Sequence, residues 1–276
     1  MKNLKVSVVI PTFNRQNTII KTIESVLNQS LRPDEIIVID DGSNDNTKYI
    51  LKEYLEKIVY IFQDNLGVSS ARNKGINVAK NRWIAFLDSD DIWHKDKLKI
   101  QIDFHEKNKN FLWSHTNEVW IKNNIKVNKK KHQQKFGGDV FDKALNQMFI
   151  SPSSVIINKD IFDKVGLFDE NLPVCEDYDL WLRVLSFYQI GYIDIELVDK
   201  IAKEENNQLS TKYWGMDRFR IKSLYNLWEK TAKEMLKSKI EKNLLQKVNL
   251  LMIGAIKHKN LQLIDDLNNI LHKIKL

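Results

Sequence analysis

The sequence predicts an α/β protein with a mostly parallel sheet flanked by helices, followed by a C-terminal α-helical region. Two observations lead to this fold class. Through the first two hundred residues, short runs rich in β-branched residues alternate with amphipathic helical patterns, which is typical of a parallel, helix-covered sheet. After residue 198 the β-type runs stop, and three amphipathic helical patterns with few breakers follow from Tyr213 to the end.

Four β-type runs define the predicted strands of the first half. Residues 6–10 form the first strand, because their β-branched content is typical of a buried strand and Pro11 ends it. The other three strands are expected over 36–39, 58–62 and 83–87. Helical patterns over 17–27, 49–56 and 68–80 separate these strands, as the connections of a parallel sheet require.

The alternation is looser beyond Asp91. We expect helices over 95–108, 139–148 and 176–188, and strands over 112–121, 153–157 and 190–198. The segment 123–135 is polar and basic, which predicts an exposed loop or an edge hairpin. We place a boundary near Ser210, which divides the chain into residues 1–210 and a helical region over 211–276.

Composition excludes several classes of protein. The chain has 276 residues and a mass of 32.5 kDa, enough for a sizeable core without disulfides or structural metal. Its longest apolar run, residues 250–256, is far shorter than the roughly 20 residues that cross a bilayer. The first eleven residues have the pattern of a strand rather than of a signal peptide, and Cys175 is the single cysteine. We therefore expect a cytoplasmic protein.

The positive charge is concentrated at one end of the sequence. The formal net charge is +7, and residues 211–276 hold 14 Lys/Arg and 6 Asp/Glu, so this region carries +8 and the rest −1. A basic, helix-patterned region suits nucleic acid or an anionic membrane surface, but it is most often only a solvated face.

Polar clusters follow three of the predicted strands, over 11–14 (PTFN), 40–43 (DDGS) and 88–91 (DSDD). Ligands of open parallel sheets collect at the carboxyl ends of the strands, where these clusters lie. Each cluster alone is also typical of a turn or a helix N-cap. Five carboxylates at two strand ends are costly when dry and unpaired, so the three clusters together favour a wet or cation-binding site.

Asp88 and Asp90 are the candidate metal ligands. If the chain stays extended past Leu87, residues two apart point to the same side, and both carboxylates face one space. Two carboxylates on one side suit Mn²⁺ or Mg²⁺, which prefer oxygen ligands and complete their shells with water and substrate phosphates.

Several other kinds of site are excluded by their missing motifs. The chain has no G-x-x-x-x-G-K-[ST] loop, no G-x-G-x-x-G after a strand, no H-E-x-x-H helix and no G-x-S-x-G elbow. One cysteine cannot build a zinc knuckle. These absences leave a carboxylate-rich, metal-assisted site for a phosphorylated ligand.

Five motifs, taken together, resemble a known family. They are VSVVIPTFNR (6–15), IIVIDDGSNDNT (36–47), GVSSARNKGI (67–76), WIAFLDSDD (83–91) and EDYDLWLR (176–183). In order and spacing they are similar to the family 2 glycosyltransferases with the GT-A fold, over roughly residues 4–210. The resemblance implies inverting transfer of a sugar from a nucleotide donor, usually a UDP-sugar, assisted by Mn²⁺ or Mg²⁺.

The resemblance also implies roles for single residues. Pro11, Thr12, Phe13 and Asp41 would hold the nucleobase, with Phe13 at a position where the family often has Tyr. Arg72 would lie beside the nucleotide. Asp88 would contact the nucleotide-sugar and the metal, and Asp90 would ligate the metal. Asp177 would be the general base, beside Glu176. A histidine that often precedes Asn-x-x-Ser in the family is replaced here by Glu204, which leaves one metal or phosphate contact open.

General-base chemistry sets opposing demands on Asp177. Removing the acceptor proton in the transition state typically contributes about 10²–10⁴-fold to the rate. The first turn of a helix favours the carboxylate and lowers its basicity, whereas Glu176 or a buried setting raises it. Without the other motifs, this acidic pair would simply complement the helix dipole. Trp181 lies on the apolar stripe of the same helix and is expected in the core.

Other functions stay open at this point. A nucleotidyltransferase also combines a nucleotide-binding sheet with paired carboxylates, but its first strand is normally followed by a glycine-rich basic loop. A non-enzymatic protein that binds nucleic acid or membrane through the basic region is the alternative from another class, although no nucleic-acid motif is present.

The resemblance implies a cell-surface polysaccharide or glycolipid pathway, with a glycan or glycolipid acceptor. No Gln-x-x-Arg-Trp motif is present, so we expect addition of a single sugar rather than polymerisation. The basic region would then contact anionic lipid at the inner face of the cell membrane, and we expect no nucleic-acid partner.

Overall fold

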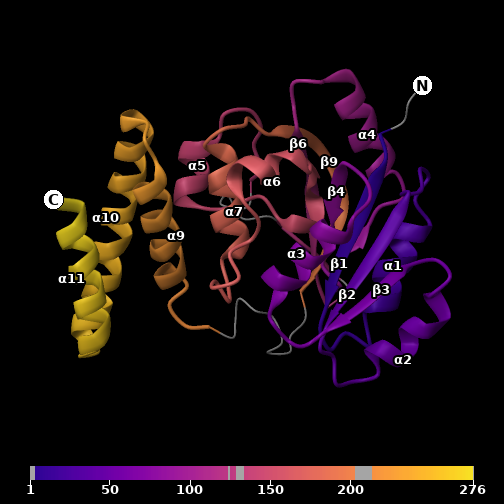
Figure 1. Ribbon diagram of the computed structural model, residues 1–276, viewed down its shortest axis with the longest axis horizontal. Helices are drawn as coiled ribbons and strands as arrows, with labels where there is room; N and C mark the ends of the chain where they lie inside the picture. The colour runs from indigo at the N-terminus through magenta and orange to yellow at the C-terminus, as the bar shows by residue number, and fades with distance from the viewer. Residues whose placement is uncertain (1–3, 124, 129–133, 203–212, 276) are drawn as a thin grey trace.

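The computed structural model describes residues 4–123, 125–128, 134–202 and 213–275. The sheet lies at one end of the molecule and the last three helices at the other, with α5, α6 and α7 between them (Figure 1). This arrangement confirms the predicted fold class, a mostly parallel sheet flanked by helices and followed by a helical C-terminal region.

The strands form one sheet in the order β3-β2-β1-β4-β8-β6-β9-β5, with β7 paired to β6. Neighbours run parallel from β3 to β4 and again between β6 and β9, whereas β8, β5 and β7 are antiparallel to their partners. The strands are β1 (Val6–Thr12), β2 (Glu35–Asp41), β3 (Val59–Gln63), β4 (Trp83–Phe86), β5 (Ile92–Trp93), β6 (Trp113–Lys122), β7 (Ile125–Val127), β8 (Ile156–Asn158) and β9 (Gly191–Ala202).

Helices cover both faces of the sheet. Helices α1 and α4 share one apolar core with the sheet, and α3, α5, α6 and α7 share the other. The helices before the C-terminal region are α1 (Ile19–Leu27), α2 (Thr47–Leu51), α3 (Val68–Val78), α4 (Lys97–Lys107), α5 (Phe141–Asn146), α6 (Asp160–Val165) and α7 (Glu176–Leu185), with short 3₁₀ turns η1 (Lys52–Tyr54) and η3 (Pro152–Ser154).

The central strand β1 shows why its sequence is almost continuously apolar. Successive side chains of a strand point to opposite faces. Val8 and Ile10 therefore enter the core beneath α1 and α4, while Val9 enters the core beneath α3. Both faces of β1 are covered, so an alternating polar pattern is absent, as expected for a buried parallel strand.

The C-terminal helices extend one of these cores. They are α9 (Asp217–Lys230), α10 (Glu234–Lys257) and α11 (Leu261–Lys275). Leu224 and Leu244 belong to the same buried cluster as Trp181, which confirms that Trp181 is a core residue. The predicted boundary near Ser210 lies outside the described residues, so the division into 1–210 and 211–276 stays a prediction. In the described part of the chain, none of the helices has the length and apolarity needed to traverse a bilayer.

Three local predictions need refinement, and two short elements were not predicted. Residues 153–157 do not form one strand, because Pro152 opens a 3₁₀ turn and β8 begins only at Ile156. The short strand β5 and the helix α6 were not predicted. The predicted helix over 49–56 is a shorter helix, α2, followed by the turn η1. The open choice over 123–135 is decided in its first part, where β6 and β7 form a hairpin.

Candidate active site

The three polar clusters meet at one edge of the sheet. Strands β2, β1 and β4 are neighbours and run parallel, so their carboxyl ends lie side by side. The clusters after β1 and β2 are also tied together. The Asn14 backbone N–H donates to the Ser43 hydroxyl at 2.9 Å, and the Asn44 N–H donates to the Asn14 side-chain oxygen at 2.9 Å. We call this edge the carboxylate rim.

At the end of β1 the chain passes from the core to the surface. Pro11 and Thr12 are buried within the strand, and Phe13 is 41% exposed. The Thr12 hydroxyl makes no hydrogen bond to the described protein atoms. An exposed aromatic face beside a buried, unused hydroxyl suits recognition of a planar, polar ring.

Asp41 orders the loop after β3. One of its oxygens accepts from the Gln63 amide at 2.7 Å and the Leu66 N–H at 3.0 Å, and the other accepts from the Gly67 N–H at 2.8 Å. Gly67 has a φ of 95°, a conformation that favours glycine. The Asp41 carboxylate, which the resemblance predicts to contact the nucleobase, thus already accepts the hydrogen bonds that fix the entry to α3.

The sequence predicts that Asp88 and Asp90 face one space if the chain stays extended past Leu87. The chain does not stay extended there, so this condition is wrong. Strand β4 ends at Phe86, and the chain turns over 88–91, with the Asp91 N–H donating to the Asp88 carbonyl at 3.0 Å. The two carboxylates still influence each other. Burial and the charge of Asp88 raise the pKa of Asp90, while Arg15, 3.4 Å from Asp90, opposes this.

Lys200 of β9 is a rim residue that the sequence analysis missed. Its ammonium lies 2.8 Å from Asp91 and 3.8 Å from Asp88. Burial raises the pKa of Asp91 to about 7 with help from Asp88 and Asp90, while Lys200 acts to lower it. The available signal is that Lys200 follows the core residue Val198 by two positions on one strand, so both point to one face.

Ser153 holds the same turn from the other side. Its hydroxyl donates to Asp91 at 2.5 Å and accepts from the Asp88 N–H at 3.1 Å. This serine belongs to the turn η3, so a segment that is distant in the sequence fixes the acidic turn.

Arg72 joins the rim to helix α7. Its guanidinium donates to Asp88 and to Glu176, each at 2.7 Å, and lies 5.2 Å from the centre of the Phe168 ring. Burial acts to lower the pKa of Arg72, but the charges of Asp88 and Glu176 outweigh burial and raise it. A buried, permanently charged group therefore connects the end of β4 with the start of α7.

Asp177 follows Glu176 in the first turn of α7 and is partly buried. Burial and the neighbouring charge of Glu176 raise its pKa to about 6, against the charge of Arg72. Of the opposing effects expected from the sequence, those that raise the pKa of Asp177 are therefore the larger. A carboxylate with a pKa near neutrality is well suited to accept a proton.

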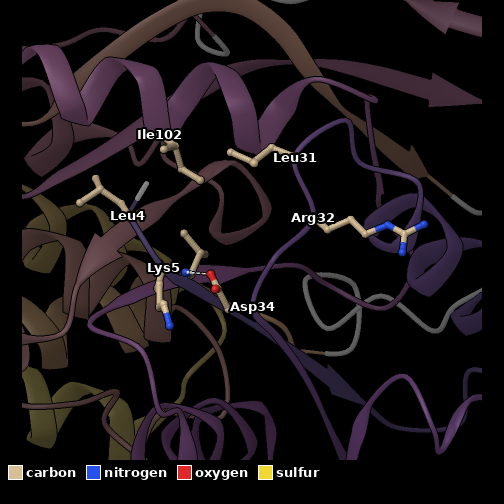
Figure 2. Close-up of a pocket in the computed structure, with 7 residues that line it drawn as sticks. Leu4, Lys5, Leu31, Arg32, Asp34 and Ile102 are labelled. Carbon is tan, nitrogen blue, oxygen red and sulfur yellow. Dashed lines mark hydrogen bonds between the residues drawn. The ribbon is translucent and has the colours of Figure 1, made fainter. Parts of the chain in front are cut away.

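A depression near the amino end of β1 lies away from these residues. It measures about 600 Å³ and is lined by Leu4, Lys5, Leu31, Asp34 and Ile102, among others (Figure 2). One oxygen of Asp34 accepts from the Val6 N–H at 3.0 Å at the amino end of β1. None of the predicted site residues lines it.

A comparison with protein families decides the relationship. The family model described as "Glycosyl transferase family 2" matches residues 7–166. This chain belongs to glycosyl transferase family 2. The resemblance found in the motifs is therefore confirmed.

Named relatives agree with this membership. An uncharacterized glycosyltransferase of Rickettsia felis is 41% identical over 201 residues, covering 71% of this chain but 33% of that protein. This chain thus spans about a third of the length of that relative. It is 32% identical to an Escherichia coli protein, the UDP-Glc:alpha-D-GlcNAc-diphosphoundecaprenol beta-1,3-glucosyltransferase WfgD, covering 79% of this chain and 85% of that protein.

The fold of this chain matches the crystal structure of TarS. Residues 1–349 of TarS from S. aureus, in complex with UDP-GlcNAc, superpose with a TM-score of 0.72 at 20% identity. The match covers 90% of this family 2 chain and 73% of that chain. It confirms the GT-A fold.

The rim residues fit a divalent cation that is shared with a substrate. Among the residues that the structure describes, no group of three or more His, Cys, Asp or Glu side chains is arranged to hold a metal by itself. Asp90 keeps a partly exposed carboxylate whose ion pair is long, at 3.4 Å. Mg²⁺ is usually held by one or two carboxylates together with substrate phosphates, which is the set that Asp90 and Asp88 offer. Glu204 lies outside the described residues.

Proposed function

We propose that this protein is an inverting glycosyltransferase that moves a single sugar from a nucleotide-sugar, a UDP-sugar, to an acceptor hydroxyl. The observation that carries the proposal is the Arg72 bridge, because it brings Asp88, on the donor side, next to the helix that presents Asp177. The name of WfgD specifies UDP-Glc, and TarS was solved with UDP-GlcNAc, which supports a UDP-sugar donor.

The donor would lie along the carboxylate rim. Phe13 stacks on the base, while the Thr12 hydroxyl and Asp41 hydrogen-bond to its polar edge. Arg72 and Asp88 lie next to the ribose and the diphosphate. These roles are the ones that the family resemblance implies. The exposed ring of Phe13 and the neighbouring strand ends, where ligands of parallel sheets collect, support them.

Asp90, with Asp88, would hold Mn²⁺ or Mg²⁺. The cation would offset the negative charge that grows on the departing diphosphate. Arg15 and Lys200 already place positive charge beside these carboxylates, so the rim is prepared for a diphosphate.

Asp177 would act as the general base. Its carboxylate removes the proton of the acceptor hydroxyl while the oxygen attacks the anomeric carbon from the face opposite the diphosphate. The bond from that carbon to the diphosphate oxygen breaks, and the configuration inverts. The raised pKa of Asp177, about 6, supports this role, because the carboxylate is ionised at neutral pH yet more basic than an ordinary aspartate.

We infer a glycan or glycolipid acceptor in cell-surface polysaccharide synthesis, by analogy with the lipid-linked acceptor in the name of WfgD. The protein would contact the cytoplasmic membrane face peripherally through α10 and α11. Leu250, Ile253 and Ile256 are each at least 60% exposed there, and Lys257 follows them. Flotation with liposomes that is independent of anionic lipid would remove this part of the proposal.

The test is a screen of nucleotide-sugars for Mn²⁺-dependent turnover and thermal stabilisation, with two variants. Asp90→Ala should lose metal-dependent donor binding. Asp177→Ala should keep donor binding and lose transfer. Asp103→Ala, an exposed carboxylate of α4, is the matched control and should behave as the parent. Normal transfer by both variants would reject the assignment, and formation of a nucleotide-sugar from a nucleoside triphosphate and a sugar phosphate, with release of inorganic pyrophosphate, would instead indicate a nucleotidyltransferase.

A further inference from the structure

A second cavity lies where α6 and α7 meet α9 and the start of α10. Its volume is about 560 Å³, within the range of about 300–1,000 Å³ that is typical of small-molecule sites. Figure 1 shows α6 and α7 in the middle of the molecule and α9 and α10 toward its C-terminal end. The cavity contains none of the residues of the carboxylate rim.

Apolar side chains form part of the lining of this cavity, alongside Ser186, Asn226 and Thr231. Val165 and Leu167 approach from the end of α6, and Leu227 and Leu236 from the C-terminal helices. Phe187, just after α7, is 52% exposed at its edge. An exposed aromatic ring beside a partly open apolar cavity offers surface that a ligand with an apolar chain would remove from water.

Arg183, whose guanidinium nitrogens all donate hydrogen bonds within the protein, forms one wall of the cavity. Arg183 forms an ion pair with Asp179 at 2.6 Å, and its other nitrogen donates to the Val165 carbonyl. It also donates to the Leu167 carbonyl at 2.7 Å. These contacts hold the α6–α7 connection in place, so the cavity has a fixed wall rather than a loose loop.

The remaining charges at the cavity are predominantly basic. Lys164, Lys230 and Lys233 are exposed, and in the described part of the chain no ion pair involves them. Lys164 lies 5.1 Å from the centre of the Phe187 ring. Asp179 is engaged by Arg183, which leaves Asp169 as the remaining acidic side chain of the lining. Three available ammonium groups around these apolar side chains favour a negatively charged head and an apolar body.

We propose that this cavity binds a phosphate ester of a long apolar chain, with the phosphate among Lys164, Lys230 and Lys233 and the chain on the apolar part of the lining. A free phosphate would leave the apolar surface uncovered, and an uncharged lipid would leave the lysines without a partner. Only a molecule that joins a phosphate to an apolar chain contacts both the lysines and the apolar surface.

This inference goes beyond the proposed function, because binding of a lipid phosphate does not depend on what the rim transfers. The two sites are nevertheless joined by one helix. Asp177 and Arg183 are six residues apart on α7, about 9 Å along the helix axis at 1.5 Å per residue. If the acceptor is lipid-linked, this cavity is placed to hold its lipid end.

Equilibrium dialysis of the full chain with farnesyl phosphate, farnesol and inorganic phosphate tests the proposal. We expect farnesyl phosphate to bind at least about tenfold more tightly than either part alone, equivalent to about 1.4 kcal/mol. Lys230→Glu/Lys233→Glu should weaken that binding by about tenfold or more. The matched control, Lys21→Glu/Lys99→Glu, makes the same charge change on exposed positions of α1 and α4 outside the cavity and should bind as the parent.

A second variant separates loss of the site from loss of the fold. Ala232→Trp places a bulky ring at the edge of the cavity and should abolish farnesyl phosphate binding while the melting temperature and UDP-sugar binding stay unchanged. Equal binding of farnesyl phosphate by the parent and by both cavity variants would overturn the proposal, as would binding no tighter than that of farnesol.

Competition identifies the source of the phosphate ester. Displacement of farnesyl phosphate by phosphatidylglycerol vesicles would support a membrane phospholipid as the occupant. Retention of farnesyl phosphate in the presence of those vesicles would support a prenyl phosphate. Failure of sugar transfer alone would count against the proposed function and leave these binding results unaffected.

Discussion

Arg72 donates a 2.7 Å hydrogen bond to Glu176, a residue 104 positions later in the chain. The pair is buried, and it sets the charge around the neighbouring Asp177. Glu176 raises the pKa of Asp177 and Arg72 lowers it, so the basicity of the proposed catalytic residue depends on a balance between two adjacent charges.

Glu176→Gln should move the acid limb of the pH–rate profile to lower pH. The amide can still accept from Arg72, but it removes the negative charge that raises the pKa of Asp177. A base must be deprotonated, so kcat/KM of the parent should fall as the pH drops below about 6, which reflects the free enzyme. In the variant this fall should begin at lower pH. An unchanged acid limb would contradict the assignment of Asp177 as the base.

Lys200→Met should destabilise the protein increasingly as the pH rises. Burial lifts the pKa of Asp91 from 3.8 to about 7 in the folded state. A raised carboxyl pKa favours folding at low pH, and this contribution is lost as the pH rises from about 4 through about 7. Without the ammonium, the folded-state pKa rises further and the loss extends to higher pH. Melting temperatures measured between pH 5 and 9 check this.

Two further variants control for the loss of side-chain volume at Lys200. Lys200→Arg keeps the charge and should keep most of the stability at every pH. Lys200→Met/Asp91→Asn removes both charges and should recover the pH-dependent part of the loss, because no carboxylate is left to ionise without its partner. A constant difference in melting temperature between Lys200→Met and the parent would show that the ion pair is not its cause.

The position of the site could be predicted because it follows from neighbouring parallel strands. The clusters after β1, β2 and β4 are short-range signals, and the parallel order brings their ends together. Arg15, Ser153 and Lys200 could not be assigned to this site in the same way. They come from segments whose placement depends on long-range packing. A single Lys or Ser in a strand or turn does not by itself indicate a binding site.

Local conformation limited the prediction at the finest scale. Asp88 and Asp90 were paired by assuming an extended chain, whereas the turn over 88–91 is stabilised by its own backbone hydrogen bond and by Ser153. The strand β5 has two residues, too few for a periodic pattern to show. The helix α6 has six residues and was missed for the same reason.

Glu118→Gln should destabilise the protein strongly. Lys135 lies 2.7 Å from Glu118, and both side chains are almost completely buried. Burial acts to raise the pKa of Glu118, but Lys135 and Lys200 outweigh burial and lower it to about 2. Removing one partner of a buried ion pair costs about 3–5 kcal/mol. Urea unfolding at pH 7 should show a loss of this size.

The pH dependence and a double variant test the same ion pair. A depressed carboxyl pKa stabilises the fold above its unfolded value of 4.5, and this stabilisation is lost as the pH falls toward 2, so the variant and the parent should converge there. Glu118→Gln/Lys135→Met should regain much of the lost stability, because no buried charge is left unpaired. Equal losses for the single and the double variant would argue against the pair.

Gly75→Ala should destabilise the protein although alanine is the better helix former. Gly75 lies within α3, where this exchange normally gains up to about 1 kcal/mol. A Cβ at this position would lie 2.3 Å from a methyl carbon of Val9, which is fully buried in the central strand β1. Forcing an extra methyl group into a close-packed core costs about 1–3 kcal/mol, so the clash outweighs the helical gain.

Urea unfolding should show a lower free energy of unfolding for Gly75→Ala, whereas Asn77→Ala on the exposed side of α3 should not lower it. Because Val9 is the cause, Gly75→Ala/Val9→Ala should lose less stability than the two single variants added together, and strict additivity would place the constraint elsewhere.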